Sequence, residues 1–447
     1  MSRAPERLEQ RAQRANLHSV HVLKRPESEA VAMQSRKHLR GRAERARHVV
    51  VAGGGIAGLE TVLALRRLAG DHVRLTLVTR AALMVERPAA VAEPFPRAIA
   101  FNSNHDVRAF AHDQGVDLVF DRLVEVHGPG RTVLLASGRR PSFDALVIAT
   151  GAGLRNALPG ATTFRGRTDV IAMRGILDDL RSGRAHSIAF VLPGMSSWPL
   201  PLYELALMTG AELSADRIEG VAITVVTPEP EPLAIFGPAA RIALEPLLAE
   251  RAVTVRTGAL AAGVEPGRVI LDDGEWVAAD RVLALAAPSP RAPIGVPTDD
   301  GFVPVDEYGR VVGLDGVYAA GDVTARPLKQ GGLAAQQGDA VAQAIAAEMG
   351  VLEQPRPYRP VIRGLLLVGG PPLYLRAALR EHDATTLEPL PGASRASREA
   401  LWWPPAKVAA GYLAPYFSTA SPHSAKLHDR PGRPTGTRWQ RPWPVAR

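Results

Sequence analysis

The stretch HVVVAGGGIAGLETVLALRRLA, residues 48–69, decides the fold. Its apolar, β-branched start predicts a buried strand, and the glycines that follow lead into a segment of helical composition. Gly53 permits a tight turn, Gly55 lets a ligand phosphate approach the backbone, and Gly58 lets the helix pack against its strand. Because the strand HVRLTLVT comes next (72–79), we predict a βαβ unit with an anion site at the helix N-terminus. A glycine-rich turn without a ligand is the alternative.

A second signature lies far downstream, in VYAAGDVTA (317–325), where Gly321 and Asp322 follow another apolar strand. Between the two signatures, residues 115–153 predict short strands joined by glycine turns and ending in the buried strand ALVIATG. Residues 186–287 repeat the alternation of strands and helices. The pattern is that of an α/β protein with two Rossmann-like dinucleotide-binding domains, the second inserted in the first.

A small C-terminal module completes the predicted architecture. We divide the chain into a basic extension (1–47), the first half of a nucleotide-binding domain (48–160), an inserted nucleotide-binding-like domain (161–287), the second half of the first domain (288–350), the C-terminal module (351–417) and a basic tail (418–447).

The net charge of +8 is unevenly distributed along the chain. Residues 1–47 carry twelve Lys and Arg against five Glu, and residues 418–447 carry six against one Asp. Residues 48–417 are therefore net acidic, and we expect both basic ends to be disordered extensions without a nucleic-acid partner. The alternative is that these ends bind nucleic acid or anionic lipid. For residues 1–47, a translation start at Met33 is a further alternative.

The chain contains no cysteine, which excludes disulfides, thiolate metal sites and dithiol redox chemistry. The histidines are scattered and suggest no metal site. No apolar run approaches the ~18 residues that span a bilayer, and the N-terminus carries charges where a signal peptide is apolar. We therefore expect a cytoplasmic protein.

The order of a nucleotide-binding half, an inserted domain, a returning half with AAGD and KQGG, and a C-terminal module resembles the two-dinucleotide-domain flavoproteins. Within them the chain is most similar to type II NADH dehydrogenases and sulfide:quinone oxidoreductases, over residues 48 to about 417. The resemblance implies bound FAD, with NAD(P)H as electron donor and a quinone-like or other small acceptor.

The resemblance also implies roles for individual residues. Asp322 would accept a hydrogen bond from the ribityl chain of FAD, and Gly321 would admit the cofactor. Lys329 and the helix from Gly331 would place positive charge beside the flavin ring, which raises its potential on reduction. A solvated loop lysine is the alternative for Lys329. The full set of expected cofactor-binding residues is Gly53, Gly55, Gly58, Thr79, Arg80, Pro88, Thr150, Gly151, Gly321, Asp322, Lys329 and Gly332.

The second nucleotide-binding turn departs from the glycine pattern. It reads PGMSSWPLPLYE (193–204), and bulky Trp198 and Pro199 stand where a dinucleotide diphosphate would approach glycine. NAD(P)H binding in the standard pose is therefore in doubt. Glu229, after the next strand, holds the place of a ribose-binding acid and keeps NADH as a candidate donor.

Glu204 matches, by resemblance, a glutamate that the family holds near the reactive edge of the flavin. There it would steer a nicotinamide or relay a proton, so we take Glu204 and Lys329 as candidate catalytic residues. The alternative for Glu204 is a first-turn glutamate that the helix dipole favours.

Residues 401–417, LWWPPAKVAAGYLAPYF, concentrate aromatic side chains around Lys407. One interpretation is peripheral membrane contact, on the inner face of the membrane, since aromatic rings suit the lipid interface. The alternatives are that these rings seal the flavin pocket or form a homodimer contact.

We conclude from the sequence that the chain is an FAD-dependent oxidoreductase without a cysteine relay. Two alternatives remain: a sulfide:quinone-oxidoreductase-like scaffold that uses another donor, and a flavin-binding, redox-responsive protein without turnover.

Overall fold

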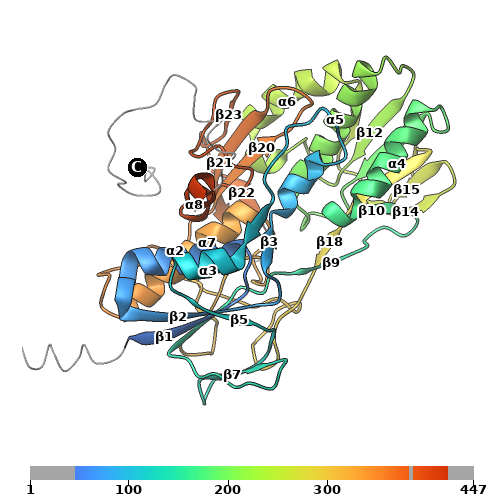
Figure 1. The fold of residues 1–447 in the computed structure, drawn as a ribbon. Coiled ribbons are helices and arrows are strands. Elements are labelled where there is room, and N and C mark those ends of the chain that lie inside the picture. The colour runs from blue at the N-terminus through green and yellow to red at the C-terminus, as the bar shows by residue number, and fades with distance from the viewer. Residues whose placement is uncertain (1–45, 382–385, 421–447) are drawn as a thin grey trace, which may run out of the picture. The chain divides into compact units, whose positions relative to one another are not determined.

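A computed structural model describes residues 46–381 and 386–420. The predicted basic segments lie almost wholly outside these residues, as does Met33. A first five-stranded sheet has the order β19-β8-β1-β2-β5, and every neighbouring pair in it is parallel. Its strands are β1 (Arg47–Ala52), β2 (Val73–Thr79), β5 (Asp117–Phe120), β8 (Ala145–Ile148) and β19 (Val317–Ala319). The sheet thus joins strands from both sides of the predicted insertion, as the sequence led us to expect (Figure 1).

Two helices contribute apolar side chains to the core beside the first sheet. These are α2 (Ile56–Ala69) and α7 (Gly331–Glu348), which pack closely against each other. The close approach requires Gly338, because a Cβ there would lie 2.6 Å from the Ala57 carbonyl oxygen. The predicted helix at 331–350 is therefore confirmed, and it brings the end of the first domain against its beginning.

A second five-stranded parallel sheet lies in the inserted region, with the order β10-β17-β11-β12-β13. Its strands are β10 (Thr162–Phe164), β11 (Ser187–Val191), β12 (Ala222–Val226), β13 (Val253–Arg256) and β17 (Arg281–Leu285). Helices α4 (Val170–Arg181), α5 (Leu200–Ala215) and α6 (Pro238–Glu250) connect its strands, and α5 is buried on nearly all sides. The fold class predicted from the sequence, two Rossmann-like domains with one inserted in the other, is confirmed.

Smaller elements complete the described chain. The antiparallel pairs and ribbons are β3 (Leu83–Val85) with β4 (Asn104–Asp106), β6 (Leu123–His127) with β7 (Thr132–Leu135), β9 (Gly153–Arg155) with β18 (Ala287–Ser289), and β14 (Ala261–Glu265), β15 (Arg268–Leu271) and β16 (Trp276–Ala278). Helix α3 covers Val107–Asp113. The segment at 85–95 contains a short 3₁₀ helix, η2 (Arg87–Ala92).

The C-terminal module is a sheet followed by a short helix. Its strands are β20 (Val361–Leu366), β21 (Leu373–Glu381), β22 (Leu387–Pro389) and β23 (Arg395–Ser397), and the helix is α8 (Leu413–Ala420). Glu60 of α2, which is fully buried, accepts hydrogen bonds from the backbone N–H groups of Tyr412 (2.9 Å) and Leu413 (2.6 Å). This carboxylate fastens the start of α8 to the first domain.

The aromatic residues at 401–417 mostly pack inside the chain. Phe417 stacks on His105 at 3.5 Å between ring centroids, and Tyr416 donates to Asp113 at 2.7 Å. Trp402 is buried against Tyr374, whereas Trp403 is 63% exposed. These rings do not line the large cavity described below. In the part of the chain that the structure describes, no helix is both long and apolar enough to cross a bilayer.

Candidate flavin site

A cavity of about 980 Å³ opens at the carboxyl ends of the first sheet's strands. The residues that follow β1 (Gly53 to Ala57), β2 (Thr79 to Ala81) and β8 (Ala149 to Ala152) line one side of it. Ala320 to Asp322, after β19, line another. Carboxyl ends of parallel strands are where open α/β sheets bind their ligands, so the fold itself puts the predicted residues around one space.

The three glycines of the first turn have three different environments. Gly53 has a φ of +135°, and a Cβ there would lie 2.0 Å from the Ala149 carbonyl oxygen. A Cβ on Gly58 would lie 1.8 Å from the Gly53 carbonyl oxygen, so the helix touches its own turn. A Cβ on Gly55 would meet nothing within 4 Å, and Gly55 lines the cavity. The roles predicted for the three glycines therefore match their surroundings.

Helix α2 begins at this turn without a side-chain cap. The first N–H groups of an α-helix have no intrahelical partner, and together with the helix dipole they favour an anion. Gly55, the N-cap residue, leaves the approach open. The geometry at this end of the cavity suits a diphosphate.

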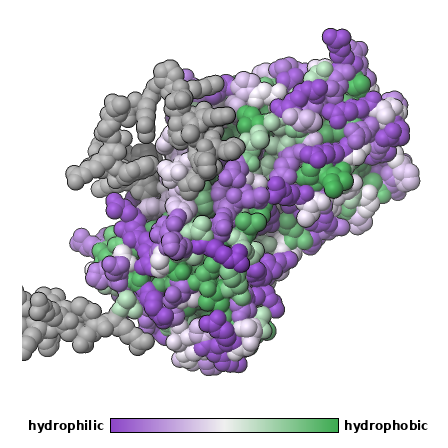
Figure 2. All heavy atoms as spheres, in the orientation of Figure 1, coloured by the Kyte–Doolittle hydropathy of each residue, from purple (hydrophilic) through white to green (hydrophobic). Residues whose placement is uncertain are grey.

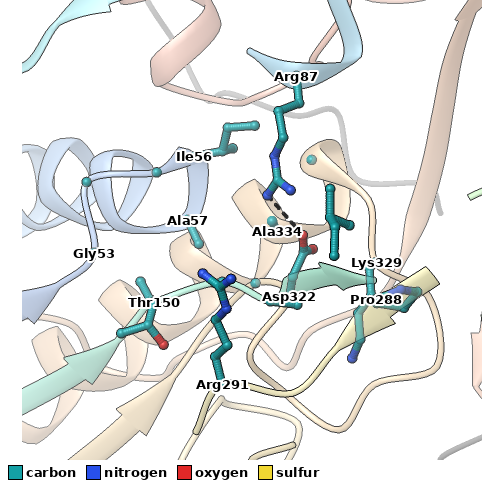
Figure 3. A pocket seen from close by; sticks show the side chains of 18 of the residues that line it. Gly53, Ile56, Ala57, Arg87, Thr150, Pro288, Arg291, Asp322, Lys329 and Ala334 are labelled. Atoms are coloured by element: carbon teal, nitrogen blue, oxygen red, sulfur yellow. Dashed lines mark ion pairs between the residues drawn. The ribbon is translucent and has the colours of Figure 1, made fainter. Parts of the chain in front are cut away.

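Asp322 lies across the cavity from the η2 segment. Its turn is held by Gln337, whose Oε1 accepts from the Gly321 N–H (2.9 Å) and the Thr324 hydroxyl (3.1 Å). Burial raises the pKa of the Asp322 carboxyl, and Arg87 and Lys329 oppose this. Arg87 points at Asp322 from the opposite wall, with its Nη2 4.0 Å from an Asp322 oxygen (Figure 3). The side chain of Asp322 is still 26% exposed, so its oxygens can accept from ligand hydroxyls.

Cations predominate in the cavity lining. They are Arg80, Arg87, Arg122, Arg165, Arg291 and Lys329, against Asp121 and Asp322. Figure 3 draws both Arg291 and Thr150 among the residues that line the cavity. The Thr150 Oγ1 is buried with no hydrogen-bond partner among the described residues. A diphosphate would neutralise the excess positive charge of the lining, and the hydroxyl groups of a polyol would form hydrogen bonds with Thr150 and Asp322. The residues present therefore fit FAD, whose diphosphate and ribityl chain carry these groups.

Lys329 lies in the cavity wall, but its ammonium group bonds to the backbone. Its Nζ donates to the carbonyl oxygens of Thr324 and Arg326 and lies 4.0 Å from the Phe302 ring centroid. Burial lowers the pKa of Lys329 to about 8, partly opposed by Asp322. In this arrangement Lys329 closes the loop that leads to α7. Its positive charge is near the cavity, as expected, yet it is directed at the protein's own carbonyls.

Glu204 does not line the large cavity; it is fully buried behind it, on α5. It forms an ion pair with Lys407, which is also buried, and its Oε1 accepts from the Leu367 N–H at 2.9 Å. Lys407 also donates to the Leu365 carbonyl oxygen at 2.7 Å. Burial raises the pKa of Glu204 and lowers that of Lys407, and the attraction between them opposes both shifts.

A small cavity of about 20 Å³ separates this ion pair from the large cavity. Glu204, Lys407 and Arg363 line it on one side. The two cavities share the wall residues Pro88, Trp198, Pro201, Gln330 and Gly331. Its volume is enough for about one water molecule. The Glu204 Oε2, which is buried and has no partner among the described residues, would need such a water.

Glu229, the expected ribose-binding acid, is 2% exposed. Its Oε2 accepts from the Tyr203 hydroxyl at 2.8 Å and from the Thr227 hydroxyl at 3.0 Å. Burial raises its pKa to about 7. The structure thus places this carboxyl inside the inserted domain.

Most predicted cofactor residues surround the one cavity. Those that line it are Gly53, Gly55, Thr79, Arg80, Pro88, Thr150, Gly151, Gly321, Asp322 and Lys329. Gly58 and Gly332 do not: Gly58 packs the helix on its turn, and Gly332 lies in α7 against Gln330 and the Ala409 carbonyl oxygen.

Several charged residues at the site were not predicted from the sequence, among them Arg87, Arg291 and Lys407, the partner of Glu204. Arg87 had a local signal, since it immediately precedes Pro88. Arg291 and Lys407 reach the site only through tertiary contacts, and Lys407 is 203 residues from Glu204.

Comparisons with known proteins agree with this geometry. Residues 47–345 match the family model described as pyridine nucleotide-disulphide oxidoreductase. An NADH dehydrogenase-like protein of Mycobacterium tuberculosis is 31% identical over 298 residues, 62% of this chain and 72% of the relative. A chlorobenzene dioxygenase ferredoxin reductase component of a Cupriavidus strain is 29% identical, over 69% of this chain and 77% of its own. The solved sulfide:quinone oxidoreductase of Aquifex aeolicus has a similar fold, with a TM-score of 0.67 and 22% identity over 84% of this chain and 89% of that one.

The open side of Gly55 yields a prediction about cofactor retention. Gly55→Ala adds a methyl group where the diphosphate approaches, so we expect FAD affinity to fall at least about tenfold. The unfolding midpoint of the flavin-free protein should not change, because the methyl meets no protein atom within 4 Å. Gly194→Ala, in the second turn, also meets no atom within 4 Å and is the matched control. Flavin titration of both variants checks this, and equal affinity would contradict it.

Proposed function

This chain belongs to the pyridine nucleotide-disulphide oxidoreductase family, and we propose that it is an FAD-dependent oxidoreductase that passes electrons from NAD(P)H to a quinone-like or other small acceptor. One observation carries the proposal: the open N-terminus of α2, the buried Oγ1 of Thr150, and Asp322 line the same cation-rich cavity. FAD bound there would supply two-electron chemistry between a donor and an acceptor.

The electron donor must reach the flavin directly. In related chemistry a cysteine pair can carry electrons between flavin and substrate, but this chain contains no cysteine. The edge of the cavity that faces the inserted domain is formed by Phe164, Ser196, Trp198 and Leu285. We propose that the donor enters against this edge.

We propose that the ion pair of Glu204 and Lys407 supplies the protons that accompany acceptor reduction. Burial favours the neutral form of both side chains, so a proton shared between them is easily exchanged. The small cavity connects the pair to the wall of the large one. A single water there would link Glu204 to the flavin chamber.

The two alternatives from the sequence remain open beside this proposal. The burial of Glu229 favours a scaffold that takes electrons from a donor other than NAD(P)H. A flavin-binding protein without turnover would need no proton path, so the buried ion pair and the small cavity that shares a wall with the large one count against it.

Turnover can be tested on the purified holoenzyme under anaerobic conditions. We expect dithionite to bleach the flavin and a short-chain ubiquinone analogue to restore its colour, with the quinone reduced. A flavin that dithionite bleaches but that no quinone reoxidises would contradict acceptor reduction. Bleaching by NADH or NADPH then tests the donor separately.

Glu204→Gln removes the exchangeable proton while leaving an amide oxygen to accept from Leu367. We expect FAD content to be unchanged and the proton-coupled steps, namely flavin reduction and quinone reduction, to slow about 100-fold. In the wild type these rates should fall as pH rises through the raised pKa of Glu204, because the carboxyl then loses its proton. In the variant this dependence should disappear.

Glu212→Gln is the control for this substitution. Glu212 lies on the same helix and is also buried, but it pairs with Arg97 and Arg181 and lines neither cavity. We expect lower stability and an unchanged pH profile. Equal rates in wild type and Glu204→Gln would remove Glu204 from the mechanism.

A further inference from the structure

The two nucleotide-binding turns of this chain differ in the backbone donors that they offer. In α2 the N-cap is Gly55, and the N–H groups of the first turn face an open approach. In α5 the N-cap is Pro199, and Pro201 follows within the first turn. Proline has no N–H group. The Leu202 N–H is already used, since it donates to the Pro199 carbonyl oxygen at 3.0 Å. Helix α5 therefore offers a diphosphate far fewer donors than α2.

The single glycine of the second turn does not compensate. Gly194 leaves open space, as Gly55 does, since a Cβ there would meet nothing within 4 Å, but unlike Gly55 it does not line the large cavity. By contrast, Gly53 and Gly58 make contacts that only glycine allows. Trp198 occupies the turn instead and packs on Phe236, with 5.6 Å between ring centroids. The second turn is thus filled by its own side chains.

The place of the ribose-binding acid is closed as well. Glu229 and Tyr203 are 2% and 0% exposed, and they bond to each other across the space between β12 and α5. Neither lines the large cavity, which on this side ends at Ser196 to Trp198 and Pro201. The Glu229 Oε2 is held by Tyr203 and Thr227, and the Oε1, which has no partner among the described residues, is buried as well. A ribose could therefore reach this carboxyl only if the side chains around it moved.

What remains open at this edge suits a flat, largely apolar molecule. The wall is formed by Phe164, Trp198, Pro201 and Leu285, with hydroxyls from Ser196 and Ser197. The adjacent cation, Arg165, is engaged by Asp169 at 2.8 Å. Hydrophilic side chains cover much of the face in Figure 2, and apolar ones show between them. Leu83 (54% exposed) and Ile294 (66%) also line the cavity, but they belong to the first domain and not to this edge.

We infer that the inserted domain does not bind the ADP half of a dinucleotide, and that the electron donor is a compact planar molecule recognised by its ring alone. This inference rests on the proposed flavin function and specifies its donor. NADH would then react through its nicotinamide ring while its ADP half stays unbound. The inserted domain would form a wall of the donor site.

Binding can be measured without turnover, by titrating ADP-ribose into the FAD-loaded protein in a calorimeter. We expect no saturable heat at millimolar ligand, for the wild type and for Glu229→Gln. Saturable binding that Glu229→Gln weakens would overturn the inference, because it would place the ribose on that carboxyl.

Anaerobic flavin reduction by NADH and by reduced nicotinamide mononucleotide decides the second part. Both carry the same ring, and only NADH has the ADP half. We expect their rate constants to agree within about threefold, since remote groups that are not bound contribute nothing. A large advantage for NADH would overturn the inference. So would a flavin that dithionite bleaches and that neither compound reduces.

These outcomes are separate from failure of the proposed function. A protein without FAD, or one whose dithionite-reduced flavin no quinone reoxidises, would contradict the function and not the donor. Should Glu229→Gln fail to fold, the comparison of NADH with its mononucleotide in the wild type decides alone.

Discussion

The structure depends on one close approach of backbone to backbone. The first turn of the first domain presses against the end of β8, and the start of α2 presses against the turn itself. Only glycine at 53 and 58 permits both contacts. They fix the N-terminus of α2 at the carboxyl edge of the sheet, where its unpaired N–H groups face the cavity. The cations and the Asp322 turn are then arranged around that end.

Two buried glutamates connect the C-terminal part of the chain to the two nucleotide-binding domains. Glu60 fastens the start of α8 to α2, and Glu204 fastens the C-terminal module to α5 through Lys407. A buried ion pair is costly to desolvate and contributes little net stability compared with apolar packing. Its position beside a small cavity that shares a wall with the large one is the reason we assign it a role with protons.

Much of this was predictable from the sequence because the deciding signals are local. The strand, the three glycines and the helix all lie within residues 48–69. The spacing of the glycines has a physical reason, because each one permits a particular turn or close approach. The same holds for Gly321 and Asp322 after β19, and for the absence of the glycine pattern at 193–204. The fold class followed from these signals, and ten of the twelve expected cofactor residues line the cavity.

What the sequence did not predict arises from distant contacts. The sequence around Glu204 gives no sign that Lys407 pairs with it. Likewise, the sequence around Glu229 gives no sign that its buried carboxyl accepts a hydrogen bond from Tyr203. Lys329 was expected to face the flavin, but it bonds to carbonyl groups only three and five residues away. The most direct test of the account is to identify the cofactor in the purified, unsupplemented protein, from its visible spectrum and by mass spectrometry after acid release. We predict FAD bound at the α2 turn, close to one per chain in the wild type and less in Gly55→Ala; a protein that binds no flavin even when FAD is added would contradict this prediction.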